Sequence, residues 1–239
     1  VVYRFSTDKM NKRMYTTLFL DLDNTIYDFS ASSREAYREV YQSMDYDRFF
    51  PSFDAYIALY EGHNAELWTL YNAGRITKVE LNTERYLHPL RIAGVEKAKT
   101  LSREFFRRAM QVLPTKGILI PHALETLDYL RPRYRLFILS NGFTELQARK
   151  MQAAGIDGYF DGIVLSEDIG VNKPDHRLFD YALSVACAMA DEVLMIGDDF
   201  NVDIAGARDA GWRQMFYNPH RIIPPFTPTY EIYSLDEVT

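Results

Sequence analysis

Hydrophobic and polar residues follow two kinds of pattern along this chain. Short apolar runs, each bounded by polar or turn residues, predict buried strands at 17–22, 135–140, 162–165, 192–196 and 213–216. Amphipathic helical patterns alternate with them at 122–130, 144–154, 175–188 and 202–210. Because strand and helix alternate, the pattern predicts an α/β fold with a doubly wound, mostly parallel sheet.

The segment between the first strand and the second has a different pattern, which is helical from about residue 32 to about residue 112. Ser32 with Glu35, and Thr77 with Glu80, have the spacing of capping boxes at helix starts. Apolar residues recur at helical spacing after each start, and four helices of this length form a small bundle.

The helical segment therefore reads as an insertion into the α/β domain. We expect a core formed by residues 14–30 and 115–239, and a helical cap formed by residues 31–114. Residues 1–13 are left outside this prediction. The prolines after residue 223 predict a non-helical tail at the end of the chain.

Composition narrows the class of protein. With 47% hydrophobic residues among 239, the chain can bury a large core, which excludes global disorder. A net charge of −6 argues against binding to a nucleic acid polymer. No apolar run approaches the length of a membrane span and no signal peptide is visible, so we expect a cytoplasmic protein. The single cysteine, Cys187, lies in an apolar helical pattern and is expected in the core.

Two aspartates follow the first strand, and they are the first chemical signal. Asp21 and Asp23 are separated by one residue, so in an extended chain their side chains project the same way. Two such charges about 4 Å apart repel by about 4 kcal/mol at an effective dielectric constant of about 20. A fold tolerates that repulsion if a cation sits between them or one carboxyl stays protonated. The alternative is two solvated aspartates at a strand end.

Polar groups also follow the later strands. Ser140-Asn141-Gly142 ends the second strand, and Gly197-Asp198-Asp199 ends another before a helix that carries Asp203. Lys173 precedes a helix that Asp175 can cap. The carboxyl ends of parallel strands form the ligand-binding edge of an α/β sheet, so these groups are expected to share one site.

Taken in chain order, four motifs resemble those of the haloacid dehalogenase (HAD) superfamily of aspartyl-phosphate hydrolases. They are Asp21-Leu-Asp23-Asn-Thr25, Ser140-Asn141-Gly142, Asn172-Lys173-Pro174-Asp175, and Gly197-Asp198-Asp199 with Asp203. The resemblance covers roughly residues 17–218. It implies a HAD-like Rossmannoid core with a helical cap inserted after the first motif. Residues 140–147 and 166–174 further resemble the bacterial pyrimidine 5′-nucleotidase branch.

The resemblance implies catalytic roles for three residues. Asp21 is expected to be the nucleophile that forms an aspartyl phosphate. Asp23 is expected to protonate the leaving group and then to deprotonate water, and Thr25 to pack the turn and hydrogen-bond Asp23. Lys173 is expected to pair with the phosphate and with the nucleophile.

The remaining motif residues are expected to bind phosphate and metal. Ser140 and the Asn141 amide are suited to phosphoryl oxygens. Mg²⁺ is the expected cofactor, with Asp21, the Asp23 carbonyl and Asp198 as ligands. Asp203 is expected to lie outside the ligand set and to hold metal-bound water or Lys173. Asp199 is expected either to support the metal ligands or to face the solvent.

These observations predict a Mg²⁺-dependent phosphatase acting on a small phosphomonoester, with nucleoside 5′-monophosphates as the preferred class. The helical cap is expected to select the substrate, through aromatic rings that stack a nucleobase. The alternatives are a sugar-phosphate phosphatase or phosphoglucomutase-like phosphotransferase and, from another class, a non-catalytic phospho-acceptor module. We expect no membrane or nucleic acid partner, and a monomer or weak homodimer.

Overall fold

The computed structural model describes residues 15–238, and residues 1–14 and 239 lie outside the described part of the chain. Within it the chain forms two compact units. The core unit joins residues 15–29 to residues 117–238, and the helical unit is Ser30–Lys116. The assignment of these units as catalytic core and substrate-selecting cap stays a prediction.

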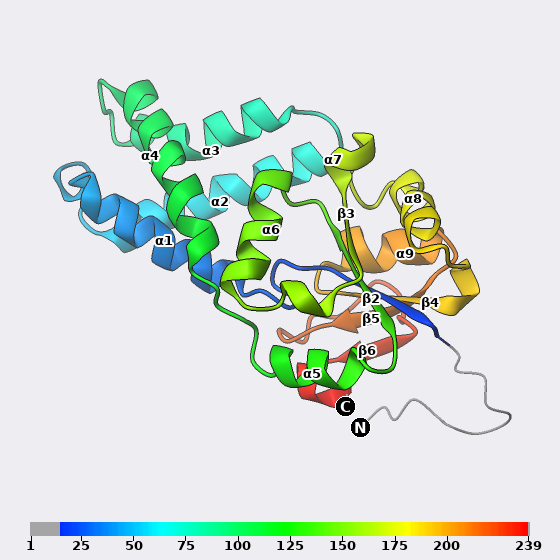
Figure 1. The fold of residues 1–239 in the computed structure, drawn as a ribbon. Helices are drawn as coiled ribbons and strands as arrows, with labels where there is room; N and C mark the ends of the chain where they lie inside the picture. The colour runs from blue at the N-terminus through cyan, green and yellow to red at the C-terminus, as the bar shows by residue number, and fades with distance from the viewer. Residues whose placement is uncertain (1–14, 239) are drawn as a thin grey trace, which may run out of the picture. The chain divides into compact units, whose positions relative to one another are not determined.

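The core unit contains a sheet of six strands in the order β3-β2-β1-β4-β5-β6 (Figure 1). All five strand pairs are parallel, and β1 lies between β2 and β4. The strands are β1 Thr17–Leu20, β2 Arg135–Ser140, β3 Gly162–Leu165, β4 Val193–Gly197, β5 Arg213–Tyr217 and β6 Tyr230–Ile232. The doubly wound α/β prediction is therefore confirmed, and the carboxyl ends of β2, β1 and β4 lie next to one another.

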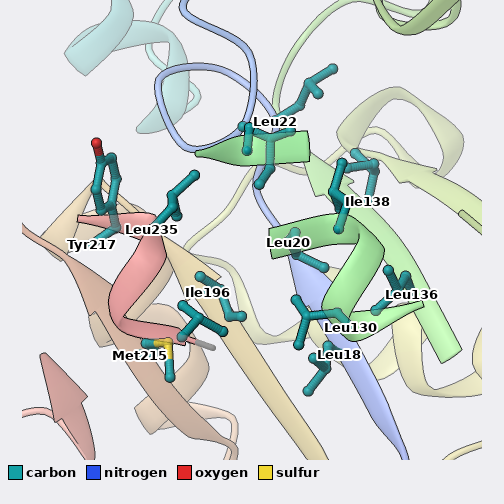
Figure 2. Close-up of a cluster of buried hydrophobic side chains, with 14 of the residues drawn as sticks. Leu18, Leu20, Leu22, Leu130, Leu136, Ile138, Ile196, Met215, Tyr217 and Leu235 are labelled. Atoms are coloured by element: carbon teal, nitrogen blue, oxygen red, sulfur yellow. The ribbon is translucent and has the colours of Figure 1, made fainter. Parts of the chain in front are cut away.

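Helices cover both faces of this sheet because successive strand residues point to opposite sides. On one face Leu18, Leu20, Leu136 and Ile138 pack with Leu130 and other apolar residues (Figure 2). On the other face Phe19, Phe137 and Met195 pack with Phe179 and Trp212. The core helices are α5 Ala123–Leu130, α6 Thr144–Ala153, α7 Ser166–Ile169, α8 His176–Ala186 and α9 Ala205–Asp209. Burying each large apolar side chain contributes about 1.5–3 kcal/mol, so the two faces fix the strand register.

The helical unit is built from four helices around an aromatic interior. The helices are α1 Phe29–Ser43, α2 Phe53–Asn72, α3 Lys78–Ile92 and α4 Ala98–Val112. The Tyr37 hydroxyl lies 3.1 Å from the hydroxyls of both Tyr60 and Tyr86, and all three rings are buried. No described helix is long and apolar enough to cross a membrane. Short helical turns connect the main elements, at Tyr46–Arg48, Leu113–Thr115, Asp157–Tyr159, Ala190–Glu192, Phe200–Ile204 and Leu235–Val238.

Two local predictions were wrong. Helix α1 begins at Phe29, so Ser32 is a buried residue inside the helix and does not cap it. Cys187 is exposed because α8 ends at Ala186 and the cysteine adopts a left-handed backbone, which turns its side chain out of the apolar stripe. The tail, predicted to be non-helical, contains the strand β6, whose residue Glu231 accepts a 2.7 Å hydrogen bond from Asn218.

The second predicted capping box is confirmed and gives a stability prediction. The Thr77 hydroxyl accepts a 3.2 Å hydrogen bond from the Glu80 amide, and Glu80 accepts one of 2.7 Å from the Thr77 amide. Thr77→Ala should lower the free energy of unfolding by about 1 kcal/mol, measured by urea denaturation. Thr69→Ala, at an exposed position inside α2, is the matched control and should cost nothing, because alanine is the better helix former. Equal effects of the two substitutions would contradict the capping role.

Candidate active site

The candidate site starts where β1 ends. The Asp21 amide continues the parallel ladder by donating to the Ile196 carbonyl at 2.9 Å, which places its carboxyl at the carboxyl edge of the sheet. A tight turn follows, in which Asn24 adopts a left-handed backbone and its amide bonds the Tyr27 carbonyl. The side chain of Asp21 is buried, whereas that of Asp23 remains 25% exposed.

Lys173 is the cationic centre of the site, and its side chain is 1% exposed. Its ammonium group donates to Asp21 Oδ1 at 2.7 Å, to Asp203 Oδ1 at 2.6 Å and to the Leu139 carbonyl at 2.6 Å. Burial alone lowers the pKa of Lys173, but the carboxylates of Asp203 and Asp21 together raise it above its ordinary value. All three donor positions of the ammonium are therefore used, and Lys173 stays charged.

Asn141 fixes the backbone that carries this lysine. Its side-chain nitrogen donates to the Lys173 carbonyl at 3.0 Å, and its side-chain oxygen accepts from the Lys173 amide at 2.8 Å. The sequence led us to expect a phosphate contact from the Asn141 backbone. The structure gives its side chain a further task, which is to hold the lysine loop against the end of β2.

Asp203 is buried beside Gly197. One of its oxygens accepts from Lys173, and the other accepts from the Asp199 amide at 3.1 Å. A Cβ atom at Gly197 would overlap the Asp203 carboxyl group, so only glycine fits at the end of β4. Asp199 itself is exposed and caps the following turn, because its carboxylate accepts from the Asn201 and Val202 amides.

Asp198 differs from Asp21, Asp23 and Asp203 because no lysine in the described part of the chain pairs with it. It accepts a 3.0 Å hydrogen bond from the Thr25 hydroxyl, which we had expected to bond Asp23. That expectation was wrong, because the turn after β1 points Thr25 toward β4. Burial, with a further contribution from the nearby Asp203 charge, raises the pKa of Asp198 to about 7.

The carboxyl oxygens of Asp21, Asp198 and Asp203 lie within 4.8 Å of one another and form a group that could hold a metal ion. Burial also raises the pKa of Asp21 well above its ordinary range. With Asp23 included, four carboxyl groups face the two ammonium groups of Lys173 and Lys150, so the site has an excess of two negative charges when all four are ionised. An all-oxygen donor set with this excess charge fits a hard divalent cation.

Ser140 lies at the end of β2 and its side chain is buried. Its hydroxyl oxygen accepts hydrogen bonds from the Gly142 amide at 3.0 Å and from Gln147 Nε2 at 2.7 Å. Two donors occupy both acceptor positions of the oxygen. The hydroxyl proton therefore points away from these partners and can be donated to a ligand.

Two residues near Asp23 were missed from the sequence. Lys150 donates to Asp23 Oδ1 at 2.7 Å and to Oδ2 at 3.0 Å, and Gln147 donates to Oδ2 at 3.0 Å. Both lie on α6, in the buried stripe that also contains Leu146 and Met151. Polar residues at helical spacing inside an apolar stripe were the signal that could have indicated them.

Comparisons with known proteins agree with this geometry. Residues 15–211 match the family described as haloacid dehalogenase-like hydrolase. The pyrimidine 5′-nucleotidase YjjG of Escherichia coli is 32% identical over 224 residues, which cover 92% of this chain and 95% of YjjG. The pyrimidine 5′-nucleotidase PynA of Streptococcus pneumoniae is 29% identical, with 94% of this chain and 93% of PynA covered.

A solved structure is similar over nearly the whole chain. The HAD-hydrolase YfnB of Bacillus subtilis is 30% identical, and the match covers 95% of this chain and 94% of YfnB. Its crystal structure, bound to magnesium, superimposes with a TM-score of 0.85 at 29% identity, covering 94% of this chain and 96% of that chain. The resemblance inferred from the sequence motifs is confirmed.

The carboxyl cluster predicts that Mg²⁺ stabilises the protein. At 100 times its dissociation constant, a ligand that binds only the folded state adds about 2.7 kcal/mol, which corresponds to a rise in Tm of about 5–10 °C for a chain of this size. Asp198→Asn should abolish most of this rise, whereas the matched variant Asp199→Asn should retain it, because asparagine also caps a helix. Differential scanning fluorimetry with and without Mg²⁺ measures both. A full rise in Asp198→Asn would contradict the cluster as the metal site.

Proposed function

The chain belongs to the haloacid dehalogenase-like hydrolase family, and on this premise we propose that it is a Mg²⁺-dependent phosphomonoesterase that prefers nucleoside 5′-monophosphates. The observation that carries the proposal is the convergence of two separately held aspartates at one sheet edge. Asp21 is paired with Lys173 beside the acidic cluster, and Asp23 is paired with Lys150. Such a pair can divide nucleophilic attack and proton transfer between two carboxyl groups.

Asp21 is the proposed nucleophile. A carboxylate oxygen attacks phosphorus, and the bond from phosphorus to the leaving alcohol oxygen breaks as the aspartyl phosphate forms. Asp23 gives a proton to that oxygen, so the product leaves as an alcohol. A water molecule then attacks phosphorus and gives one proton to Asp23, and the bond between phosphorus and the Asp21 oxygen breaks. This step releases phosphate, leaves Asp21 as a carboxylate and returns Asp23 to its protonated form.

The phosphoryl group is bound by donors at the same edge. The Ser140 hydroxyl proton and the Asn141 amide would be donated to phosphoryl oxygens, and Lys173 supplies positive charge beside Asp21. Asp21, Asp198 and the Asp23 carbonyl would hold Mg²⁺, with Asp203 holding Lys173. Bound Mg²⁺ would offset the repulsion between the acidic cluster and a phosphate dianion.

The substrate class is supported by two relatives whose names state pyrimidine 5′-nucleotidase activity and which match the chain over nearly its full length. The motif residues contact the phosphoryl group, which all phosphomonoesters share. The rest of the substrate must be recognised elsewhere, and we assign that task to the helical unit. A non-catalytic phospho-acceptor would have no use for a second carboxyl group placed for proton transfer.

Asp21→Asn should fold and show no detectable phosphate release, because an amide does not serve as the phosphoryl acceptor. In EDTA its Tm should not fall, since the ionised form of Asp21 is disfavoured by burial in the metal-free protein. Phosphate release from p-nitrophenyl phosphate and thermal melting measure the two effects. Asp180→Asn, at an exposed position of α8, is the matched control and should keep full activity. Substantial turnover by Asp21→Asn would remove Asp21 as the nucleophile.

A substrate panel tests the preference. Stacking of a nucleobase on an aromatic side chain contributes about 1–3 kcal/mol, which corresponds to about 5- to 150-fold in kcat/KM. Nucleoside 5′-monophosphates should exceed hexose phosphates and ribose 5-phosphate by a factor in this range, with Mg²⁺ present. A clear preference for sugar phosphates would overturn the nucleotidase proposal and leave the phosphatase standing. No turnover of any phosphomonoester, p-nitrophenyl phosphate included, would overturn the phosphatase.

A further inference from the structure

A buried polar pair on α6 is not explained by the stability of the fold. Gln147 and Lys150 are one helical turn apart, and their side chains are fully or almost fully buried. A buried ion pair usually contributes no more stability than apolar residues of similar volume would. A leucine or methionine at these positions would therefore serve the packing of α6 at least as well. The contacts of the two side chains indicate a chemical role instead.

Lys150 contacts Asp23 through both carboxyl oxygens, at 2.7 Å and 3.0 Å. Its ammonium group also lies 5.4 Å from the ring centre of Tyr27 and 4.7 Å from that of Phe29. The two rings close the other sides of the ammonium with favourable cation–π contacts. Lys150 is thus confined, and it confines the Asp23 carboxylate in turn.

Gln147 links Asp23 to the phosphate-binding end of β2. Its side-chain nitrogen donates one proton to Asp23 Oδ2 at 3.0 Å and the other to Ser140 Oγ at 2.7 Å. A Cβ atom at Gly142 would overlap this amide group, so the glycine leaves the space that Gln147 occupies. One side chain therefore sets the distance between Asp23 and the serine hydroxyl.

The two contacts leave the oxygens of Asp23 in different states. Oδ2 accepts from both Gln147 and Lys150, which fills its two lone-pair positions. Within residues 15–238, Oδ1 accepts from Lys150 alone and keeps one lone-pair position open. The side chain is 25% exposed, so this position can be reached by a ligand.

We infer that Gln147 and Lys150 are positioning residues for proton transfer by Asp23, and that Oδ1 carries the transferred proton. The inference rests on the proposed phosphatase activity and adds two residues to it. The hydrogen bonds to Oδ2 hold the carboxyl group so that Oδ1 faces the leaving-group oxygen. In the first half-reaction the O–H bond at Oδ1 breaks as the proton moves to the departing alcohol. In the second half-reaction Oδ1 takes a proton from the attacking water.

The test uses two substrates that differ in their need for a proton. The 5′-oxygen of a nucleoside monophosphate leaves as an alkoxide unless it is protonated, whereas 2,4-dinitrophenolate is a stable anion and needs no proton. The parameter kcat/KM reports the steps up to aspartyl phosphate formation. Lys150→Met should lower kcat/KM for the nucleotide by about 100-fold, the lower end of typical general-acid contributions, and leave that for dinitrophenyl phosphate nearly unchanged. Asp23→Asn should show the same selective loss, and so should Gln147→Leu to a smaller extent.

The ratio of the two kcat/KM values is taken within one preparation, so partial unfolding of a variant does not change it. Arg149→Met, at the exposed neighbouring position of α6, is the matched control and should keep the ratio of the unchanged protein. Equal losses for both substrates in Lys150→Met, or a gain for the nucleotide, would overturn the positioning role while leaving the phosphatase intact. A failure of the unchanged protein to hydrolyse either substrate would overturn the proposed function and this inference with it.

Discussion

The buried ammonium of Lys173 is the interaction on which the site depends. It joins Asp21, directly after β1, to Asp203 in the helical turn after β4, and it also donates to the Leu139 carbonyl near the end of β2. The ammonium group of Lys173 thus contacts three segments that are far apart in the sequence. Removing Lys173 would leave the buried carboxyl groups of Asp21 and Asp203 without their cation, and breaking a buried ion pair in this way typically costs about 3–5 kcal/mol. Two further residues support this contact. Gly197 leaves space for the Asp203 carboxyl group, and Asn141 holds the loop that carries Lys173.

The two aspartates after β1 show how the fold manages like charges. In an extended strand they would share one face and repel each other. The turn after β1 separates them, and each receives a different lysine, with Lys173 on Asp21 and Lys150 on Asp23. Separate partners allow separate environments, because Asp21 is buried in the acidic cluster while Asp23 keeps one side open to a ligand. The proposed roles of nucleophilic attack by Asp21 and proton transfer by Asp23 require these different environments.

The acidic cluster leaves the site with more negative charge than its lysines balance. Among the described residues, the Thr25 hydroxyl alone donates a hydrogen bond to the Asp198 carboxyl group, and burial raises the pKa of Asp198 to about 7. A site of this kind binds a divalent cation well and repels an unaccompanied phosphate dianion. Metal and phosphate are therefore expected to be coupled, with each reducing the electrostatic cost of the other.

The sequence by itself determined the parallel α/β sheet, the position of the helical insertion and the meeting of Asp21, Ser140, Lys173 and Asp198 at one edge. It could do so because apolar runs mark buried strands, and parallel strands bring their carboxyl ends together. Only the tertiary structure decided that Thr25 bonds Asp198, that Cys187 faces outward and that Lys150 pairs with Asp23. Periodicity shows that a helix face is buried but does not show what it is buried against. The partners of Asp23 lie 124 and 127 residues away in the chain, and they meet it only when α6 packs beside β1 and β2.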